Sequence, residues 1–308
     1  MADRNLLGYV LVSLKGVAMG AADIVPGVSG GTIAFISGIY EELITSINNV
    51  NGEAVRKLFK EGITSFWRHI NGTFLLALIV GIGVSIISLA GVVSHLLEHH
   101  PVLIWSFFFG LIIASIWLVS KTIDKWNAGT IVALVIGIAI AFYISTLNTV
   151  AHIEGNWFIF VSGMIAICAM ILPGISGSFI LVMLGSYHQV LQAVKDKNLM
   201  LIGLFAAGCV IGLLAFSRLL KFLFAKFHSL TIALLAGFMI GALYKVWPWK
   251  INIGDAPIVV HSNGKEDWLT TNVLPSNFIG DPQVLYAVLC AVFGLVLIIG
   301  LERFAAKK

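Results

Sequence analysis

Long apolar runs fill most of the chain, and short polar segments separate them. The runs show no alternation of apolar and polar residues, and most extend over about 20 residues, the length of a helix that crosses a lipid bilayer. The pattern therefore predicts spanning helices at residues 74–94, 102–120, 129–147, 199–217, 229–246 and 283–301. Two further apolar segments, residues 6–47 and 157–194, are each interrupted by a Pro-Gly pair.

One six-residue motif occurs twice, 147 residues apart. The first copy is Pro26-Gly27-Val28-Ser29-Gly30-Gly31, and the second is Pro173-Gly174-Ile175-Ser176-Gly177-Ser178. The correspondence continues from Gly38 to Gly185 and from Tyr40 to Tyr187, and later glycines match at a distance of 127 residues. A unit of this length is a duplicated half rather than a solenoid repeat. We predict two repeats, residues 1–147 and 148–308, with an insertion in the first at residues 51–70.

The Pro-Gly pairs mark helix breaks inside apolar segments. Such a break frees backbone N–H groups that lipid cannot satisfy. Only this pair separates the two helical runs, without the charged residues and aromatic belt that an outward loop usually carries. We therefore predict that residues 6–47 and 157–194 are re-entrant hairpins rather than pairs of full spans. The same break at matching points of two halves is typical of a transporter's binding site.

The distribution of Lys and Arg predicts the orientation. They gather before residue 74, after residue 120, after residue 217 and at the C-terminus, whereas residues 95–101 and 148–156 contain neither. The positive-inside rule then places both termini in the cytoplasm, with Lys195 and Lys197 as a local exception. Because each repeat has three spans, an odd number, the repeats are predicted to be inverted. Their two tips would enter from opposite sides and meet near the bilayer middle.

Composition restricts the class of protein. Of 308 residues, 59% are hydrophobic and 11% charged, and the mean hydropathy is +0.99. Soluble domains carry roughly 25% charged residues, so this chain is predicted to be an all-α polytopic membrane protein. The net charge of +4 comes without a basic patch that would suit nucleic acid, and the three cysteines lie in apolar runs. We expect no cofactor, metal site or disulfide framework.

Two segments outside the spans have distinct patterns. Residues 51–70 place apolar side chains on one helical face and basic ones away from it, which favours an amphipathic helix on the inner leaflet over a soluble linker helix. Residues 248–282 form a polar external segment that contains a strand-like Ile258-Val259-Val260.

The tips could bind an anion. Proline suits the first turn of the following helix, glycines allow a ligand to approach closely, and free N–H groups at a helix start attract negative charge, phosphate above all. Serine and threonine hydroxyls would add to them. The alternative is that these glycines only allow close helix packing, as the GxxxG pair Gly16/Gly20 does. The predicted substrate-binding residues at the tips are Gly27, Ser29, Gly30, Gly31, Thr32, Gly174, Ser176, Gly177 and Ser178.

Charged residues near the tips are further candidates. Asp23 could bind a coupling proton or sodium ion, or could accept hydrogen bonds from its own tip; its counterpart is Met170. Lys15 could pair with Asp23, reach the phosphate or extend to the interface. Arg218 could guide an anionic head group, as could Lys221 and Lys245, although each could equally anchor the interface. Glu41 is a second coupling-ion candidate.

Two motifs suggest enzymes, but their context argues against it. Residues 27–31 fit the G-x-S-x-G nucleophile elbow, which requires a preceding strand, whereas a helix is predicted here. His95, Glu98 and His99 fit an inverted zinc motif but lie in a short outer loop without an obvious third ligand.

Residues 15–32, followed by Gly38-Ile39-Tyr40-Glu41, strongly resemble the polyprenyl-phosphate transporter family. Residues 172–178 and 185–187 look like its second signature, and the resemblance covers nearly the whole chain. It implies a bacterial or archaeal cytoplasmic-membrane protein that returns undecaprenyl phosphate from the outer to the inner leaflet. His188 stands where an acid is expected after the second Tyr, which puts a role for an acid there in doubt.

We therefore predict a polyprenyl-phosphate translocase, not an enzyme, that works by alternating access with the phosphate held between the tips. A proton or sodium ion is the candidate coupling ion, with Asp23 or Glu41 as its site. The alternatives are a transporter or channel for a small anion, and a membrane-embedded lipid phosphatase. The lipid substrate follows only from the resemblance; the residues alone indicate an anion transporter with inverted repeats.

Overall fold

The computed structural model describes residues 4–25, 28–147, 155–254, 259–260 and 266–306. It is almost entirely helical, and five helices are long and apolar enough to cross a membrane within this described part. Two shorter apolar helices lie at 156–171 and 284–300. The prediction of an all-α polytopic membrane protein is therefore confirmed.

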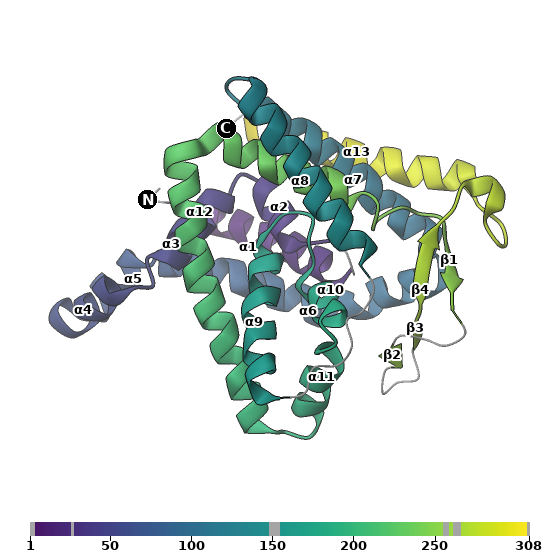
Figure 1. Ribbon diagram of the computed structural model, residues 1–308. Coiled ribbons are helices and arrows are strands. Elements are labelled where there is room, and N and C mark those ends of the chain that lie inside the picture. Colours follow the sequence, from purple (N-terminus) through teal and green to yellow (C-terminus); the bar gives the residue numbers. More distant parts are fainter. Residues whose placement is uncertain (1–3, 26–27, 148–154, 255–258, 261–265, 307–308) are drawn as a thin grey trace.

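The helices follow the predicted order along the chain (Figure 1). The first half contains α1 (Leu6–Ile24), α2 (Gly30–Ile36), α3 (Tyr40–Asn48), α4 (Gly52–Glu61), α5 (Ile63–His69), α6 (Gly72–His99), α7 (Pro101–Lys121) and α8 (Ala128–Thr146). The second half contains α9 (Asn156–Ile171), α10 (Gly177–Met183), α11 (Tyr187–Lys195), α12 (Leu199–Ala242) and α13 (Val284–Ala306).

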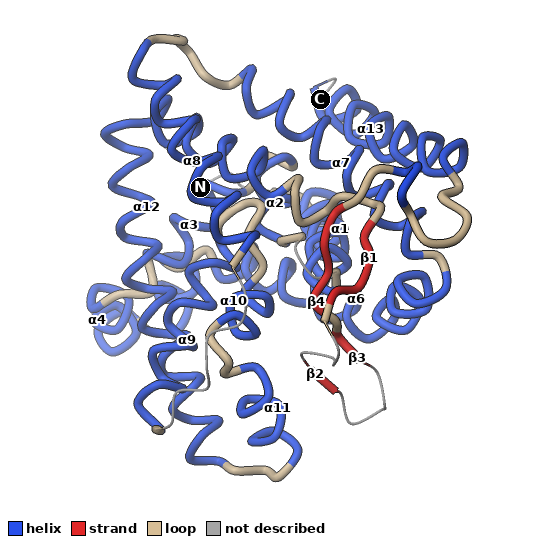
Figure 2. Tube along the Cα trace, turned by 45° about the vertical axis from the view of Figure 1, so that its right-hand side comes forward, coloured by secondary structure: helices blue, strands red, loops and turns tan. Residues whose placement is uncertain are grey.

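Small strands occupy the connection between α12 and α13 (Figure 2). Strand β1 (Lys250–Ile253) pairs antiparallel with β4 (Leu269–Asn272), and β2 (Val259–Val260) with β3 (Glu266–Asp267). A 3-10 turn, η1 (Pro275–Asn277), follows. The strand-like character of Val259 and Val260 agrees with the sequence prediction, while Ile258 lies outside the described residues.

Three glycines divide helices that the sequence predicts as continuous. Gly38 and Gly185 adopt φ of +70° and +71°, so each interrupted segment consists of three helices instead of two. Gly62, with φ of +88°, divides the predicted helix at 51–70 into α4 and α5. Left-handed backbone ends an α-helix and suits glycine, which has no Cβ to clash.

The predicted spans at 199–217 and 229–246 lie largely within α12, which consists of two helices joined at a kink. Its backbone leaves the helical region only at Phe227, where φ is −135° and ψ is 46°, and this kink separates an early part from a late part. The late part ends at Ala242, before the predicted limit at residue 246. No Gly or Pro occurs between Ser217 and Ser229, so the break depends on the backbone conformation of Phe227 and not on a helix-breaking residue type.

Glycines place the helices of each half in close contact. A Cβ on Gly81 of α6 would overlap the Ser13 carbonyl oxygen of α1, and one on Gly208 of α12 would overlap the Phe160 carbonyl oxygen of α9. Gly81 and Gly208 are corresponding glycines of the two repeats. The pair α1 with α6 is therefore packed like the pair α9 with early α12.

The remaining long helices pack between the halves. Helix α7 packs against α13, where Gly110 approaches the Ala291 backbone, and α8 packs against late α12, where Gly137 faces Gly237. Because Gly110 and Gly237 correspond in the repeats, each half contributes the same helix to a contact with the other half. The main apolar core lies among these helices and α1, α2 and α3.

The first interrupted segment returns toward its own beginning. Arg4, just before α1, donates two hydrogen bonds of 2.6 and 2.5 Å to the carboxylate of Glu42 on α3. Lys15 Nζ of α1 donates to the carbonyl oxygen of Ser37 at the end of α2, at 2.6 Å. In the second half, the Ser162 hydroxyl of α9 lies 2.7 Å from the hydroxyl of Ser186, the residue directly before α11. Ser162 stands 147 residues after Lys15.

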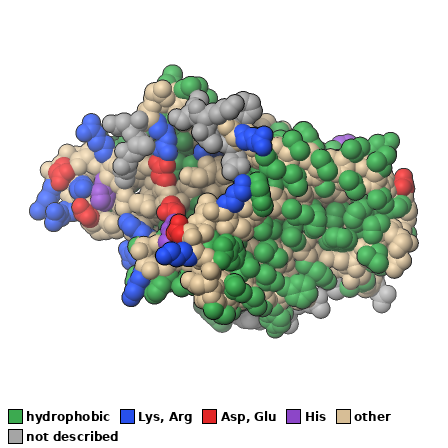
Figure 3. Space-filling model, turned by 90° about the horizontal axis from the view of Figure 1, so that it is seen from above, with side chains coloured by type: hydrophobic (Ala, Val, Ile, Leu, Met, Phe, Trp, Pro, Cys, Tyr) green, Lys and Arg blue, Asp and Glu red, His purple; other side chains and the backbone are tan. Residues whose placement is uncertain are grey.

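The outer surface separates into apolar and charged regions. Figure 3 shows a broad hydrophobic area over most of one face, with Lys, Arg, Asp and Glu side chains gathered toward one end. That end carries α4 and α5, and both chain ends lie toward it (Figure 1). On α4 and α5, Phe59 is 83% exposed and Ile63 is 73% exposed, so apolar side chains are presented there as well.

Substitution of Gly81 tests the close contact of α1 with α6. We expect Gly81→Ala to destabilise the protein by about 2 kcal/mol, because the new methyl group would force two backbones apart. Thermal unfolding of the purified protein in detergent measures the change. Gly83→Ala in the same helix is the control, since nothing lies within 4 Å of a Cβ there. Equal melting temperatures for the two variants would contradict the packing.

Candidate functional site

The two helix breaks touch each other directly. Ser29 Oγ, in the first break, donates to the carbonyl oxygen of Met170 near the end of α9, at 2.7 Å. The Gly174 N–H, in the second break, donates to Thr32 Oγ1 of α2, at 2.9 Å. A Cβ on Gly31 would overlap the Ile171 carbonyl oxygen, so only glycine permits this approach. Segments more than 140 residues apart thus form one site.

The first tip, the segment between α1 and α2, satisfies its own backbone groups. Asp23 Oδ1 accepts from the Gly30 N–H at 2.7 Å, and Ser29 Oγ accepts from the Gly31 N–H at 3.0 Å. Ser29 and Thr32 are fully buried. Asp23 is thus a hydrogen-bond acceptor for its own tip, one of the two roles that the sequence allowed, and its role as a coupling-ion site stays a prediction. Gly27 lies outside the described residues.

The second tip, the segment between α9 and α10, is more accessible. Gly174 adopts φ of +87° and lies against Phe238 and Ala242 of late α12. Ser176 precedes α10, and its side chain does not cap the helix; instead its Oγ lies 2.9 Å from Ser178 Oγ. Ser176 is 5% exposed, whereas Ser178 is exposed. Gly177 is buried, and a Cβ added to it would lie 2.8 Å from the Ala166 carbonyl oxygen.

Three charged candidates do not reach the tips. Lys15 is bound to the Ser37 carbonyl oxygen rather than to Asp23. Glu41 is exposed and pairs with His228 Nε2 at 3.1 Å, which connects α3 to late α12. Arg218 is exposed on early α12. A binding role for them is not supported by this arrangement.

The structure also identifies residues that the sequence prediction left out. Tyr40 is buried, lies edge-on to Phe35 and Phe224, and its hydroxyl has no hydrogen-bond partner among the described residues. Its correspondence with Tyr187 was a signal that could have identified it. The carbonyl oxygen of Met170 joins the tips, but a main-chain contribution leaves no signal in residue type.

The two enzyme-like motifs have other surroundings in the structure. Ser29 lies between two helices and its hydroxyl is bound to a carbonyl oxygen, so the strand of a nucleophile elbow is replaced by α1. His95 and His99 stack with ring centroids 4.1 Å apart near the end of α6. In the described part of the chain no three His, Cys, Asp or Glu side chains are grouped as metal ligands.

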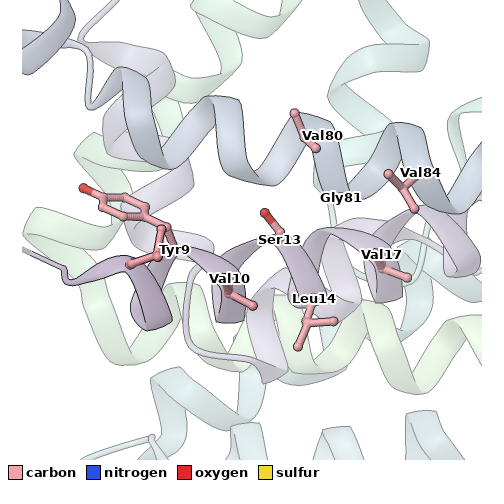
Figure 4. A pocket seen from close by; sticks show the side chains of 9 residues that line it. Tyr9, Val10, Ser13, Leu14, Val17, Val80, Gly81 and Val84 are labelled. Atoms are coloured by element: carbon pink, nitrogen blue, oxygen red, sulfur yellow. The ribbon is translucent and has the colours of Figure 1, made fainter.

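An apolar groove of about 400 Å³ runs between α1 and α6 (Figure 4). Ser13 is its polar residue at the contact and donates to the Ala77 carbonyl oxygen, so it offers little to a polar ligand. The groove therefore suits a hydrocarbon chain better than a head group. Its lining consists of Leu6, Tyr9, Val10, Ser13, Leu14, Val17, Val80, Gly81 and Val84.

Thr32→Val tests the contact between the tips. The variant keeps the shape of the side chain but removes the acceptor of the buried Gly174 N–H, so we expect a loss of about 1–3 kcal/mol in unfolding free energy. Chemical denaturation in detergent measures it. Thr146→Val, at an exposed helix end, is the control and should change little. A Thr32→Val variant as stable as the wild type would show that the contact contributes nothing measurable.

Comparison with known proteins agrees with the resemblance seen in the motifs. A family model described as undecaprenyl phosphate translocase-like (VCA0040-like) matches residues 19–261. A protein of Vibrio cholerae serotype O1 named polyprenyl-phosphate transporter is 44% identical over 313 aligned residues, covering 100% of both chains. A polyprenyl-phosphate transporter of Staphylococcus aureus is 32% identical and covers 76% of this chain and 85% of its own. No solved structure matches. The chain belongs to the undecaprenyl phosphate translocase-like family.

Proposed function

We propose that this member of the undecaprenyl phosphate translocase-like family transports a polyprenyl phosphate across the membrane. The observation that carries the proposal is the contact of the two helix breaks, which gathers serine and threonine hydroxyls and glycine amides inside an apolar bundle. Two relatives named polyprenyl-phosphate transporter support the substrate. In finer detail, the substrate is undecaprenyl phosphate, which moves from the outer to the inner leaflet so that the cell-envelope lipid carrier can be reused.

The interrupted segments act as re-entrant hairpins in two inverted repeats. Arg4, just before α1, binds Glu42 of α3, so the chain beyond the first tip comes back to the place where α1 begins. This supports a hairpin that leaves the membrane on the side it entered. The exchange of corresponding helices between the halves, α7 with α13 and α8 with late α12, supports the duplication. Both termini lie in the cytoplasm of a bacterium or archaeon in this proposal, because Lys and Arg gather before residue 74, after residue 120, after residue 217 and at the C-terminus.

The phosphate binds between the tips. Glycines there allow it to approach main-chain N–H groups, and the hydroxyls of Ser29, Thr32 and Ser176 can donate to its oxygens. In the described arrangement the tips bind each other, so an entering phosphate replaces the Ser29–Met170 and Thr32–Gly174 hydrogen bonds. A polar site of this kind lowers the large cost of moving a charged group through hydrocarbon. No covalent step is involved.

The isoprenoid tail remains on the lipid side of the bundle. The groove between α1 and α6 opens along the first turns of α1, the helix that leads to the first tip (Figure 4). Its apolar lining can hold part of a tail whose phosphate is bound further along α1. The two halves then rock so that the tips face each leaflet in turn.

Reconstitution tests the transport. Liposomes containing undecaprenyl phosphate and the protein should exchange the lipid between leaflets faster than protein-free liposomes, as measured by its exposure to an added phosphatase. Ser29→Ala with Ser176→Ala should slow the exchange, because two phosphate donors are lost, whereas Ser88→Ala, an exposed hydroxyl on α6, should not. No acceleration by the wild type would refute transport, and phosphate release without added phosphatase would indicate a lipid phosphatase.

Asp23 couples transport to a proton or sodium gradient in this proposal. Asp23→Asn keeps an oxygen that can accept from the Gly30 N–H but cannot carry a charge. We expect a folded protein whose transport no longer responds to either gradient, measured in the same liposomes. Asp124→Asn, an exposed carboxylate, is the matched control. A gradient response retained by Asp23→Asn would assign the coupling to another group.

A further inference from the structure

Two lysines lie beside the second tip, in the connection that follows α12. Lys245 Nζ lies 4.3 Å from the ring centroid of Phe179, the residue directly after Ser178 in the first turn of α10. Gly174 of the same tip packs against Ala242, three residues before Lys245. Independent contacts from both sides of the second tip thus place the Lys245 ammonium next to it.

Lys250, the second lysine, contacts the backbone of Lys245. Its Nζ donates to the main-chain carbonyl oxygen of Lys245 at 2.6 Å and lies 3.7 Å from the ring centroid of Trp105 on α7. This arrangement holds the Lys250 ammonium in place and restrains the backbone at residue 245. It also brings a second positive charge close to the first.

Within the part of the chain that the structure describes, no carboxylate pairs with Lys245 or Lys250. The Lys245 ammonium lies against the Phe179 ring instead. Burial lowers the pKa of Lys245, and burial together with the Lys245 charge lowers the pKa of Lys250 well below its usual value. Both shifts show that the positive charge is unfavourable in these partly buried positions, and an anion placed beside the lysines would stabilise their charged forms.

The surroundings of Lys245 suit a phosphate on a lipid. Ser178, exposed at the start of α10, offers a hydroxyl next to Phe179, and Ser176 lies behind it. Phe179 and Trp105 are apolar surfaces that could contact the first carbons of a chain, which free phosphate would not use. The chemical class that fits is therefore a terminal phosphate monoester on an apolar chain.

We propose that Lys245 binds the phosphate monoester of the lipid at the second tip, before the phosphate passes between the tips, and that Lys250 is its positioning residue. The proposal rests on the proposed transport of a polyprenyl phosphate and names a cation for its head group. The sequence offered Lys245 only as one of several possible cations for the head group, beside Lys15, Arg218 and Lys221, and the proposal selects it on its contacts at the second tip.

Ligand-induced stabilisation tests the site. The melting temperature of the full-length protein in detergent is measured against rising concentrations of farnesyl phosphate, farnesol and inorganic phosphate. The wild type should be stabilised by farnesyl phosphate and not by farnesol. Lys245→Gln should bind farnesyl phosphate about tenfold or more weakly, since a charged hydrogen bond is lost, and Lys245→Arg should retain most of the affinity. Lys250→Met, which keeps an apolar chain over Trp105, should show a smaller loss.

Controls separate binding from folding. Lys125→Gln removes the same charge from an exposed position between α7 and α8 and should bind like the wild type. Without ligand, Lys245→Gln should melt at or above the wild-type temperature, because it removes a positive charge from a partly buried position. Wild-type affinity in Lys245→Gln would overturn the proposal, as would a lowered melting temperature with unchanged affinity. Equal binding of inorganic phosphate would overturn the lipid-specific part.

The liposome assay distinguishes this proposal from the transport itself. If the wild type binds farnesyl phosphate through Lys245 but does not accelerate exchange of undecaprenyl phosphate, transport is refuted and the site stands. If the wild type transports and Lys245→Gln transports and binds equally well, the site is refuted and transport stands.

Discussion

A helix break inside a bilayer leaves backbone N–H groups that lipid cannot satisfy, and this constraint governs the centre of the protein. At the first tip, Asp23 and Ser29 accept from the freed N–H groups of Gly30 and Gly31. At the second, the Gly174 N–H reaches across to Thr32 of the other half. Each break therefore depends on side chains placed within hydrogen-bond distance, and one of those side chains belongs to the opposite repeat. The same groups are the ones a phosphate would use.

Close helix packing makes this meeting possible. Corresponding glycines bring α1 against α6 and α9 against early α12, so each tip is carried on a rigid pair of helices. The pairs α7 with α13 and α8 with late α12 then join the halves. Within a membrane, apolar side chains gain little by leaving lipid for protein, and close backbone contact at small residues supplies the attraction instead. Four such contacts hold the helices that carry the tips.

The distribution of charge is uneven around the tips. The first tip has a carboxylate, and it is already used by the tip's own backbone. At the second tip Met170 stands in place of the carboxylate, and Lys245 and Lys250 lie nearby without an ion-pair partner among the described residues. A negatively charged head group would therefore be attracted by the lysines at the second tip. At the first tip, the hydrogen-bonding groups are already paired with each other. In the proposed transport, this difference between the two tips would favour one direction of movement of the head group.

The sequence by itself determined the membrane class, the order of the helices and the repeated helix breaks, because span length and the effect of Pro and Gly on a helix are local properties. It also indicated that the tips contain the site, since motif and repeat coincide there. Only the tertiary structure decided which partner each side chain meets: Lys15 reaches Ser37, Arg218 is exposed, and Lys245 lies over Phe179. These contacts join different helices, some far apart along the chain, and residue type limits what a side chain can bind without saying which neighbour the packing will bring to it.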